Sequence, residues 1–159
     1  MIILATSSHY RIEAFRSLGL DFISNTNNII ENFDGRPKFP EELVFHLSKL
    51  KADFVAKNYN EGVIIGFDSV GWFNGKILEK PKSKEEAFER LKSLSGKYHE
   101  FYTGVYMIDI KSGKNISNVV STEVQMRSFS DYEINKYLDQ DEKFDTRALG
   151  YDPLENYSS

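Results

Sequence analysis

Two stretches of the chain carry no polar side chain and predict buried strands. They are residues 1–5, "MIILA", and residues 63–67, "VIIGF". A strand that is covered on both faces has this continuous pattern, which is typical of the parallel strands of α/β folds. The first stretch runs into small hydroxyl residues and then into the helical spacing of Ile12, Phe15 and Leu18. A strand joined to a helix by so few residues predicts the opening unit of an α/β domain.

The segment from Pro40 to Tyr59 has the clearest helical pattern. Pro40 suits the first helical position, and two glutamates follow it at the positive end of the helix dipole. One arc of the helix collects the apolar side chains Leu43, Val44, Leu47, Leu50, Phe54 and Val55. Lys51 projects into the middle of this arc. A lysine there extends past the apolar surface to water, pairs with an acid or contacts a ligand, and the pattern leaves these readings open.

The remaining patterns predict shorter elements and the turns between them. Ser83 with Glu86, and Ser130 with Glu133, have the spacing of helix capping boxes. The tail from Asp139 onward has no clear period. The expected strands are residues 20–24, an arm after residue 68 that turns at Asn74-Gly75, residues 100–110 and residues 115–126, and the expected helices begin near residues 10, 83 and 130.

Composition narrows the classes of partner. The 159 residues are enough for one domain, and the net charge of −4 excludes the broad basic surface that nucleic acids require. The absence of cysteine removes disulfides, thiolate catalysis and cysteine-based metal sites. No apolar run approaches the ~20 residues of a membrane-spanning helix, and the first residues lack the features of a signal peptide. We therefore expect a cytoplasmic protein that binds neither nucleic acid nor membrane.

Asp68 directly follows the apolar run and so ends the predicted strand. Ligands of open α/β sheets bind at the carboxyl ends of strands, although an aspartate there can also be a turn or capping residue. Other residues invite the same question. Ser8 lies at a helix start, where it can bind an anion or only cap the helix, and Lys80 precedes a proline, where it can also be an ordinary surface lysine. Together with Arg11 and Lys51, these groups suit a polyphosphate that carries a divalent metal, and the acid could orient or deprotonate a water.

The order of several motifs resembles the Maf protein family over nearly the whole chain. Family sequences open with a pattern like L-A-S-x-S-P-R-R-x-E-L-L, which compares with "LATSSHYRIEAF". Further along, "LKADFVA", "GFDSVG", "EKP", "LSGKYHEFYTGV" and "TEVQMRSFSDYEI" are similar to family motifs and occur in the family order. The resemblance implies a mixed, twisted sheet with flanking helices, split into two lobes by a cleft, like that of the inosine triphosphate pyrophosphatases.

The resemblance also implies an activity and roles for residues. Maf proteins hydrolyse nucleoside triphosphates to monophosphate and pyrophosphate. The resemblance therefore also implies pyrimidine or modified nucleotides as substrates, Mg²⁺ or Mn²⁺ as the metal, and a homodimer. Asp68 matches the catalytic acid, and Glu31 matches a metal-binding acid of the D-x-D-E-T motif. His99 is expected to be structural. The implied substrate-binding residues are Ser8, Tyr10, Arg11, Lys51, Ser69 and Lys80, of which Ser69 is expected near the base or sugar.

Three departures from the family pattern keep a second function open. Tyr10 replaces an arginine that helps to set substrate preference, and a glutamine of the family has only Glu155 as its nearest counterpart. The usual C-terminal segment is expected to be absent. The alternatives are a non-catalytic nucleotide-binding or cell-division regulatory protein, and a structural α/β protein that binds no nucleotide.

Overall fold

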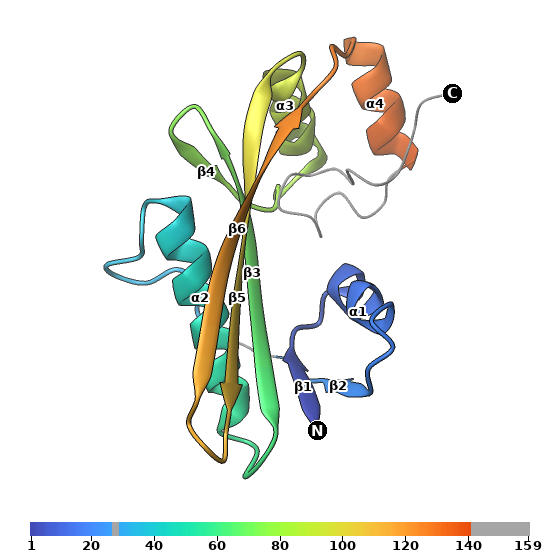
Figure 1. Cartoon of the computed structure of the whole chain (residues 1–159). Coiled ribbons are helices and arrows are strands. Elements are labelled where there is room, and N and C mark those ends of the chain that lie inside the picture. Colours follow the sequence, from blue (N-terminus) through green and yellow to red (C-terminus); the bar gives the residue numbers. More distant parts are fainter. Residues whose placement is uncertain (27–28, 141–159) are drawn as a thin grey trace. The chain divides into compact units, whose positions relative to one another are not determined.

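The computed structural model describes residues 1–26 and 29–140 (Figure 1). In these residues, strands and helices alternate along much of the chain, as the sequence predicts. The elements are β1 (Ile2–Ala5), α1 (His9–Arg16), β2 (Phe22–Ser24), α2 (Pro40–Ala56), β3 (Val63–Phe73), β4 (Lys76–Leu78), α3 (Lys84–Leu94), β5 (Tyr98–Asp109), β6 (Asn115–Gln125) and α4 (Asp131–Gln140).

The strands form one open, mixed sheet in the order β2-β1-β3-β5-β6, with β4 paired to β3. The strand β1 runs parallel to both β2 and β3, and Ile3 lies opposite Ile64. The strand β4 is antiparallel to β3 and is joined to it by a turn at Asn74 and Gly75, whose φ angles are 49° and 73°. Two successive positive φ angles are typical of a type I′ hairpin, so the predicted turn is confirmed.

The described chain forms two compact units. The first contains Met1–Ser69 and Thr103–Val120, and the second contains Val70–Tyr102 and the described residues from Ser121 onward. The first unit has a core in which β1, β3 and β5 pack against α2. Its buried members are Ile3, Ala5, Ala52, Val55, Ile64 and Tyr106.

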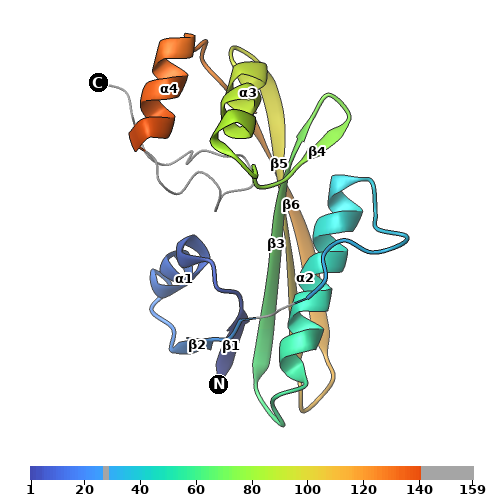
Figure 2. The same ribbon diagram turned by 180° about the vertical axis from the view of Figure 1, so that it is seen from behind.

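The helix α2 lies unusually close to the sheet in the first unit. Figures 1 and 2 show it running alongside β3 and β5. A Cβ atom added at Gly66 would lie 2.0 Å from the backbone oxygen of Ser48, and one at Gly104 would lie 2.3 Å from that of Val44. Because both strands present a glycine to the helix, its backbone can approach the sheet directly. The buried face of α2 accordingly includes Ser48, Lys51 and Ala52, whereas Phe54, expected in the apolar arc, is 37% exposed.

We expect Gly66→Ala to destabilise the protein by about 2–3 kcal/mol, because the added methyl group overpacks a backbone contact. Chemical denaturation, read from the change in the midpoint, measures this loss. Gly35→Ala is the control, since Gly35 has a φ of 79° but open space around it. Backbone strain alone predicts about 1 kcal/mol at Gly35. An equal loss at the two positions would show that close packing of α2 does not explain Gly66.

The second unit has a separate core beneath α3 and α4, which pack side by side. Both predicted capping serines accept a hydrogen bond from the N–H of their glutamate, and the Ser130 box is reciprocal, whereas the Glu86 carboxylate accepts from the Lys82 N–H. The Ser83 hydroxyl accepts a hydrogen bond from the Glu86 N–H at 3.1 Å. The Ser130 N–H donates to the Glu133 carboxylate at 2.8 Å, and this bond, with Arg127 and the Ser130 hydroxyl, lowers the pKa of Glu133 to about 2. The buried core residues are Ala87, Leu91, Leu94, Met126, Ile134 and Leu138.

The expectation that a strand ends at Asp68 is wrong, because β3 continues to Phe73. The strand exchanges partners instead. Its first part pairs with β1 as far as Gly66, which lies opposite Ala5, and its last part pairs with β4 from Gly71. Asp68 therefore lies just beyond the carboxyl end of β1, where the chain turns into α1. The rule that ligands bind at carboxyl ends of strands still applies, but the strand that ends is β1.

Candidate functional site

Lys51 and two carboxylates form the centre of the site in the first unit. The Lys51 Nζ atom lies 2.6 Å from Oδ1 of Asp68 and 2.8 Å from Oε1 of Glu31. Lys51 is 8% exposed and Asp68 is 5% exposed. Of the readings that the sequence left open for Lys51, pairing with an acid is confirmed. A buried cation interacts strongly with two neighbouring carboxylates, because little water screens their charges.

The packing of the first unit brings these groups together. Lys51 lies on α2 between Ser48 and Ala52, which contact Gly66, and Asp68 lies two residues after that glycine on β3. Residues two apart on a strand point to the same face, so Asp68 projects toward the helix as Gly66 faces it. Glu31 comes from the loop between β2 and α2 and remains about half exposed. The site thus has a fixed pair and a more accessible third member.

The two oxygens of Asp68 have different environments. Oδ1 accepts the hydrogen bond from Lys51, whereas Oδ2 is buried and has no hydrogen-bond partner among the described residues. Burial raises the pKa of Asp68, and Lys51 and then Arg11 oppose this rise. A buried acceptor without a partner is unfavourable unless a ligand or water completes it. Oδ2 is therefore the atom of this site that can accept a hydrogen bond from a ligand or water, or bind a cation.

Arg11, on α1, contacts the two residues that flank Asp68 in the sequence. Its Nη2 atom donates a hydrogen bond to the Ser69 hydroxyl at 3.0 Å, and its guanidinium carbon lies 6.0 Å from the centre of the Phe67 ring. Burial lowers the pKa of Arg11, while the charges of Asp68 and Glu31 act in the opposite direction. No carboxylate of the described chain forms an ion pair with it. A partly buried guanidinium with neutral contacts keeps its charge available for an anion.

The Ser69 hydroxyl also lies 2.9 Å from the hydroxyl of Thr103 on β5. Sequence reasoning did not single out Thr103. It lies within "LSGKYHEFYTGV", a segment used only for its resemblance to the family, and 34 residues separate it from Ser69. A threonine in a strand is ordinary, so only its neighbours in the folded chain distinguish it.

The other predicted substrate-binding residues have simpler surroundings. Ser8 is the N-cap residue of α1, but its side chain makes no capping hydrogen bond, and its N–H donates to the Thr6 hydroxyl at 3.1 Å. Tyr10 lies in the first turn of α1 with its ring edge-on to His9. Lys80 belongs to the second unit, so its predicted role at the site stays a prediction.

The acid pair fits a divalent metal of the kind that the resemblance implies. Among the described residues there is no group of three or more histidine or acidic side chains placed to hold a metal. Mg²⁺ is commonly held by one or two carboxylates and completes its shell with water and substrate phosphates. Asp68, with its buried and unpartnered Oδ2, and the half-exposed Glu31 supply such a pair.

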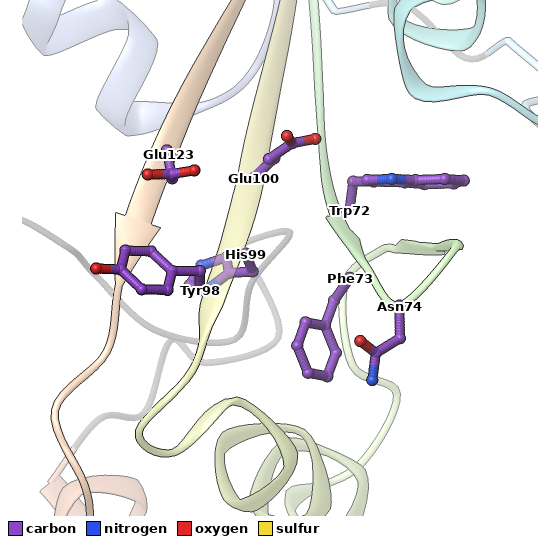
Figure 3. A pocket seen from close by; sticks show the side chains of 7 residues that line it. All are labelled: Trp72, Phe73, Asn74, Tyr98, His99, Glu100 and Glu123. Atoms are coloured by element: carbon purple, nitrogen blue, oxygen red, sulfur yellow. The ribbon is translucent and has the colours of Figure 1, made fainter.

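The second unit contains a separate open hollow of about 200 Å³ (Figure 3). His99 beside it is 3% exposed, and burial lowers its pKa, so the ring is neutral near pH 7. This burial fits the structural role expected from the sequence. The hollow is lined by Trp72, Phe73, Asn74, Tyr98, His99, Glu100 and Glu123.

The sequence profile of the Maf-like protein family matches residues 1–153. The chain belongs to the Maf-like protein family. A "dTTP/UTP pyrophosphatase" of Dictyoglomus thermophilum is 34% identical over 144 residues, which cover 91% of this chain and 75% of that protein. Another, from Fusobacterium nucleatum, is 40% identical over 144 residues, covering 91% of this chain and 74% of the relative. The family expected from the order of the motifs is thus confirmed.

A solved structure supports the expected fold. The Ham1 protein of Staphylococcus aureus superimposes with a TM-score of 0.52 at 18% identity, covering 78% of this chain and 70% of that one. At this identity, the similarity shows the fold alone. The open mixed sheet with flanking helices is therefore a Ham1-like architecture, and the cleft between two lobes stays a prediction.

Proposed function

We propose that this Maf-like chain is a nucleoside triphosphate pyrophosphatase that cleaves the bond between the α-phosphate and the β-phosphate. One observation supports this proposal above the others. Asp68 has one oxygen held by Lys51, while its other oxygen is buried and lacks a partner. A carboxylate fixed in this way is ready to accept a proton from a water molecule. A purely structural ion pair would be expected to satisfy both oxygens.

The proposed step transfers the nucleotidyl group, which is the nucleoside with its α-phosphate, to water. The water oxygen forms a bond to the α-phosphorus as its proton moves toward Oδ2 of Asp68, and the bond from the α-phosphorus to the bridging oxygen breaks. The electron pair of that bond leaves with pyrophosphate, and the nucleoside monophosphate is the second product. Because burial raises the pKa of Asp68, its carboxylate is a stronger base than an exposed aspartate.

The cations of the site bind and orient the phosphates. Arg11 presents a charge that no acid of the described residues neutralises directly, which suits a phosphate oxygen of the triphosphate. Lys51 holds the general base, Asp68, in place and is proposed to stabilise the negative charge of the phosphates. The hydroxyl of Ser8, which does not cap its helix, and the adjoining N–H groups are proposed to assist Arg11. Lys80 is proposed to bind the same triphosphate.

A divalent cation, Mg²⁺ or Mn²⁺, would be held by Asp68 and Glu31. When bound, it would polarise the phosphate oxygens and neutralise part of their charge. Lys51 occupies the space between the same two carboxylates, so its ammonium group partly balances their repulsion in the described structure.

The names of the relatives indicate the substrate class. Proteins at 34% and 40% identity are dTTP/UTP pyrophosphatases, so we propose pyrimidine nucleotides as substrates here, in a house-cleaning role. Tyr10 is proposed to stack on or hydrogen-bond to the nucleotide beside the phosphates, where the family has an arginine. A homodimer and a cytoplasmic location, which the resemblance implies, stay predictions. No helix of the described residues combines the length and apolar character required to cross a membrane.

The decisive experiment measures product formation from dTTP and UTP with Mg²⁺. We expect equal amounts of nucleoside monophosphate and pyrophosphate and no free orthophosphate, since only one phosphoanhydride bond is cleaved. ATP and GTP are the matched comparisons and should react more slowly. Binding of dTTP without any turnover would instead support the non-catalytic nucleotide-binding protein.

A further inference from the structure

Three hydrogen-bonding side chains connect α1, β3 and β5 in the first unit. Arg11 donates to the Ser69 hydroxyl at 3.0 Å, and the oxygens of Ser69 and Thr103 are 2.9 Å apart. Since Ser69 accepts from the guanidinium, its own hydrogen is available to the Thr103 oxygen. In that arrangement, each hydroxyl fixes the rotamer of the next group. The orientation of Arg11 then depends on a residue that does not contact it.

The chemical nature of these contacts has a consequence for an anion. Lys51 is paired with two carboxylates, which cancel much of its charge at a distance. Arg11 is instead held by a neutral hydroxyl, and burial already disfavours its charged form. Hydroxyl groups can therefore orient the guanidinium without neutralising it. No hydrogen bond to another described residue occupies its remaining N–H groups, which suits two-point binding of a phosphate.

We propose that Thr103 is a positioning residue for Arg11 and acts through the hydroxyl of Ser69. This inference rests on the proposed function, in which Arg11 binds the triphosphate. It also gives Ser69 a role besides the predicted contact with the base or sugar. We expect the effect on KM and not on kcat, because Arg11 is proposed to bind the phosphates, whereas the general base is Asp68.

The first test compares Thr103→Val with Thr103→Ser, using dTTP and Mg²⁺. Valine keeps the shape but lacks the hydroxyl, whereas serine keeps the hydroxyl but lacks the methyl group. We expect Thr103→Val to raise KM about 5–10-fold and to change kcat less than about twofold. The rise in KM corresponds to the loss of one hydrogen bond to Ser69, which orients the Arg11 guanidinium. Thr103→Ser should recover most of the affinity. Thr122→Val, on the exposed strand β6, is the matched control.

The second test is a double-mutant cycle with Arg11→Ala. If Thr103 acts through Arg11, then Thr103→Val should raise KM less than twofold in the Arg11→Ala background. Equal effects of Thr103→Val in both backgrounds would overturn the proposal. So would a loss of affinity in Thr103→Ser as large as in Thr103→Val, since this would assign the effect to the methyl group.

A third measurement is independent of turnover. Nuclear magnetic resonance relaxation of the Arg11 Nε–H group in the ligand-free protein should show an ordered side chain in the wild type and a mobile one in Thr103→Val. Thr103→Ser should retain the order. If no triphosphate is bound or cleaved but Arg11 loses its order in Thr103→Val, the proposed function fails and the positioning role holds. If Arg11 is equally ordered in all three proteins, the positioning role fails whatever the activity.

Discussion

Asp68→Asn is expected to lower kcat for triphosphate hydrolysis by about 10²–10⁴-fold, the range associated with loss of a positioned general base. The amide oxygen can still accept the hydrogen bond from Lys51, so the local packing changes little. The amide cannot accept the proton that the attacking water gives up. Measuring kcat and KM for dTTP with Mg²⁺, together with the melting temperature, separates this loss from a loss of folding.

The pH dependence of the wild type supplies a second check on Asp68. Burial raises its pKa above the ordinary value of 3.8, with Lys51 opposing the rise. Activity should therefore increase with pH as the carboxyl group loses its proton, and the midpoint of that limb should lie above 3.8. Because Asp68 and Lys51 interact strongly, the measured midpoint belongs to the coupled pair.

Asp53→Asn is the matched control for this prediction. Asp53 lies on α2 and pairs with the half-exposed Lys49, so the substitution removes one negative charge from the same unit without touching the site. Its kcat should stay within about twofold of the wild type, since exposed ion pairs contribute little. A similar loss in both variants would indicate a general effect of charge and would contradict the role of Asp68.

Most elements of the fold were predictable because each depends on a local pattern. Apolar runs marked β1 and the first half of β3, Pro40 marked the start of α2, and both capping boxes marked helix starts. The end of β3 was not predictable in the same way. Whether a strand continues past Asp68 depends on the partner that it finds, and β4 replaces β1 along it.

The candidate site was predictable to the extent that its residues violate local patterns. Lys51 interrupts an apolar face and Asp68 interrupts an apolar strand, so each required a partner, and they proved to be partners of one another. Thr103 violates no pattern, since a polar side chain is common on a strand. Its importance arises from a contact with Ser69 over 34 residues, which no local rule can show.

Lys51→Met is expected to lower both activity and stability. The methionine fills similar space but leaves Asp68 buried without a cation, and removal of one partner of a buried ion pair costs about 3–5 kcal/mol. The loss of an electrostatic group at the reacting phosphates should also lower kcat by about 10²–10³-fold. Lys49→Met, two residues away on α2 in a half-exposed pair with Asp53, should change stability by less than about 1 kcal/mol.

The stability of Lys51→Met should depend on pH in a direction that identifies its cause. Without the lysine, the pKa of Asp68 rises further, because the main opposing influence on its burial is lost. When the pKa of a carboxyl group is higher in the folded state, the free energy of unfolding decreases as pH rises toward that pKa. The penalty is absent below the unfolded pKa of 3.8. Denaturant unfolding at pH 7 and pH 5 should therefore show a smaller deficit at the lower pH.

The double variant Lys51→Met/Asp68→Asn should recover most of the stability at pH 7 but none of the activity, since it removes the buried charge together with the general base. If the double variant is as unstable as Lys51→Met, the deficit comes from packing around the methionine and the electrostatic account of this pair is wrong.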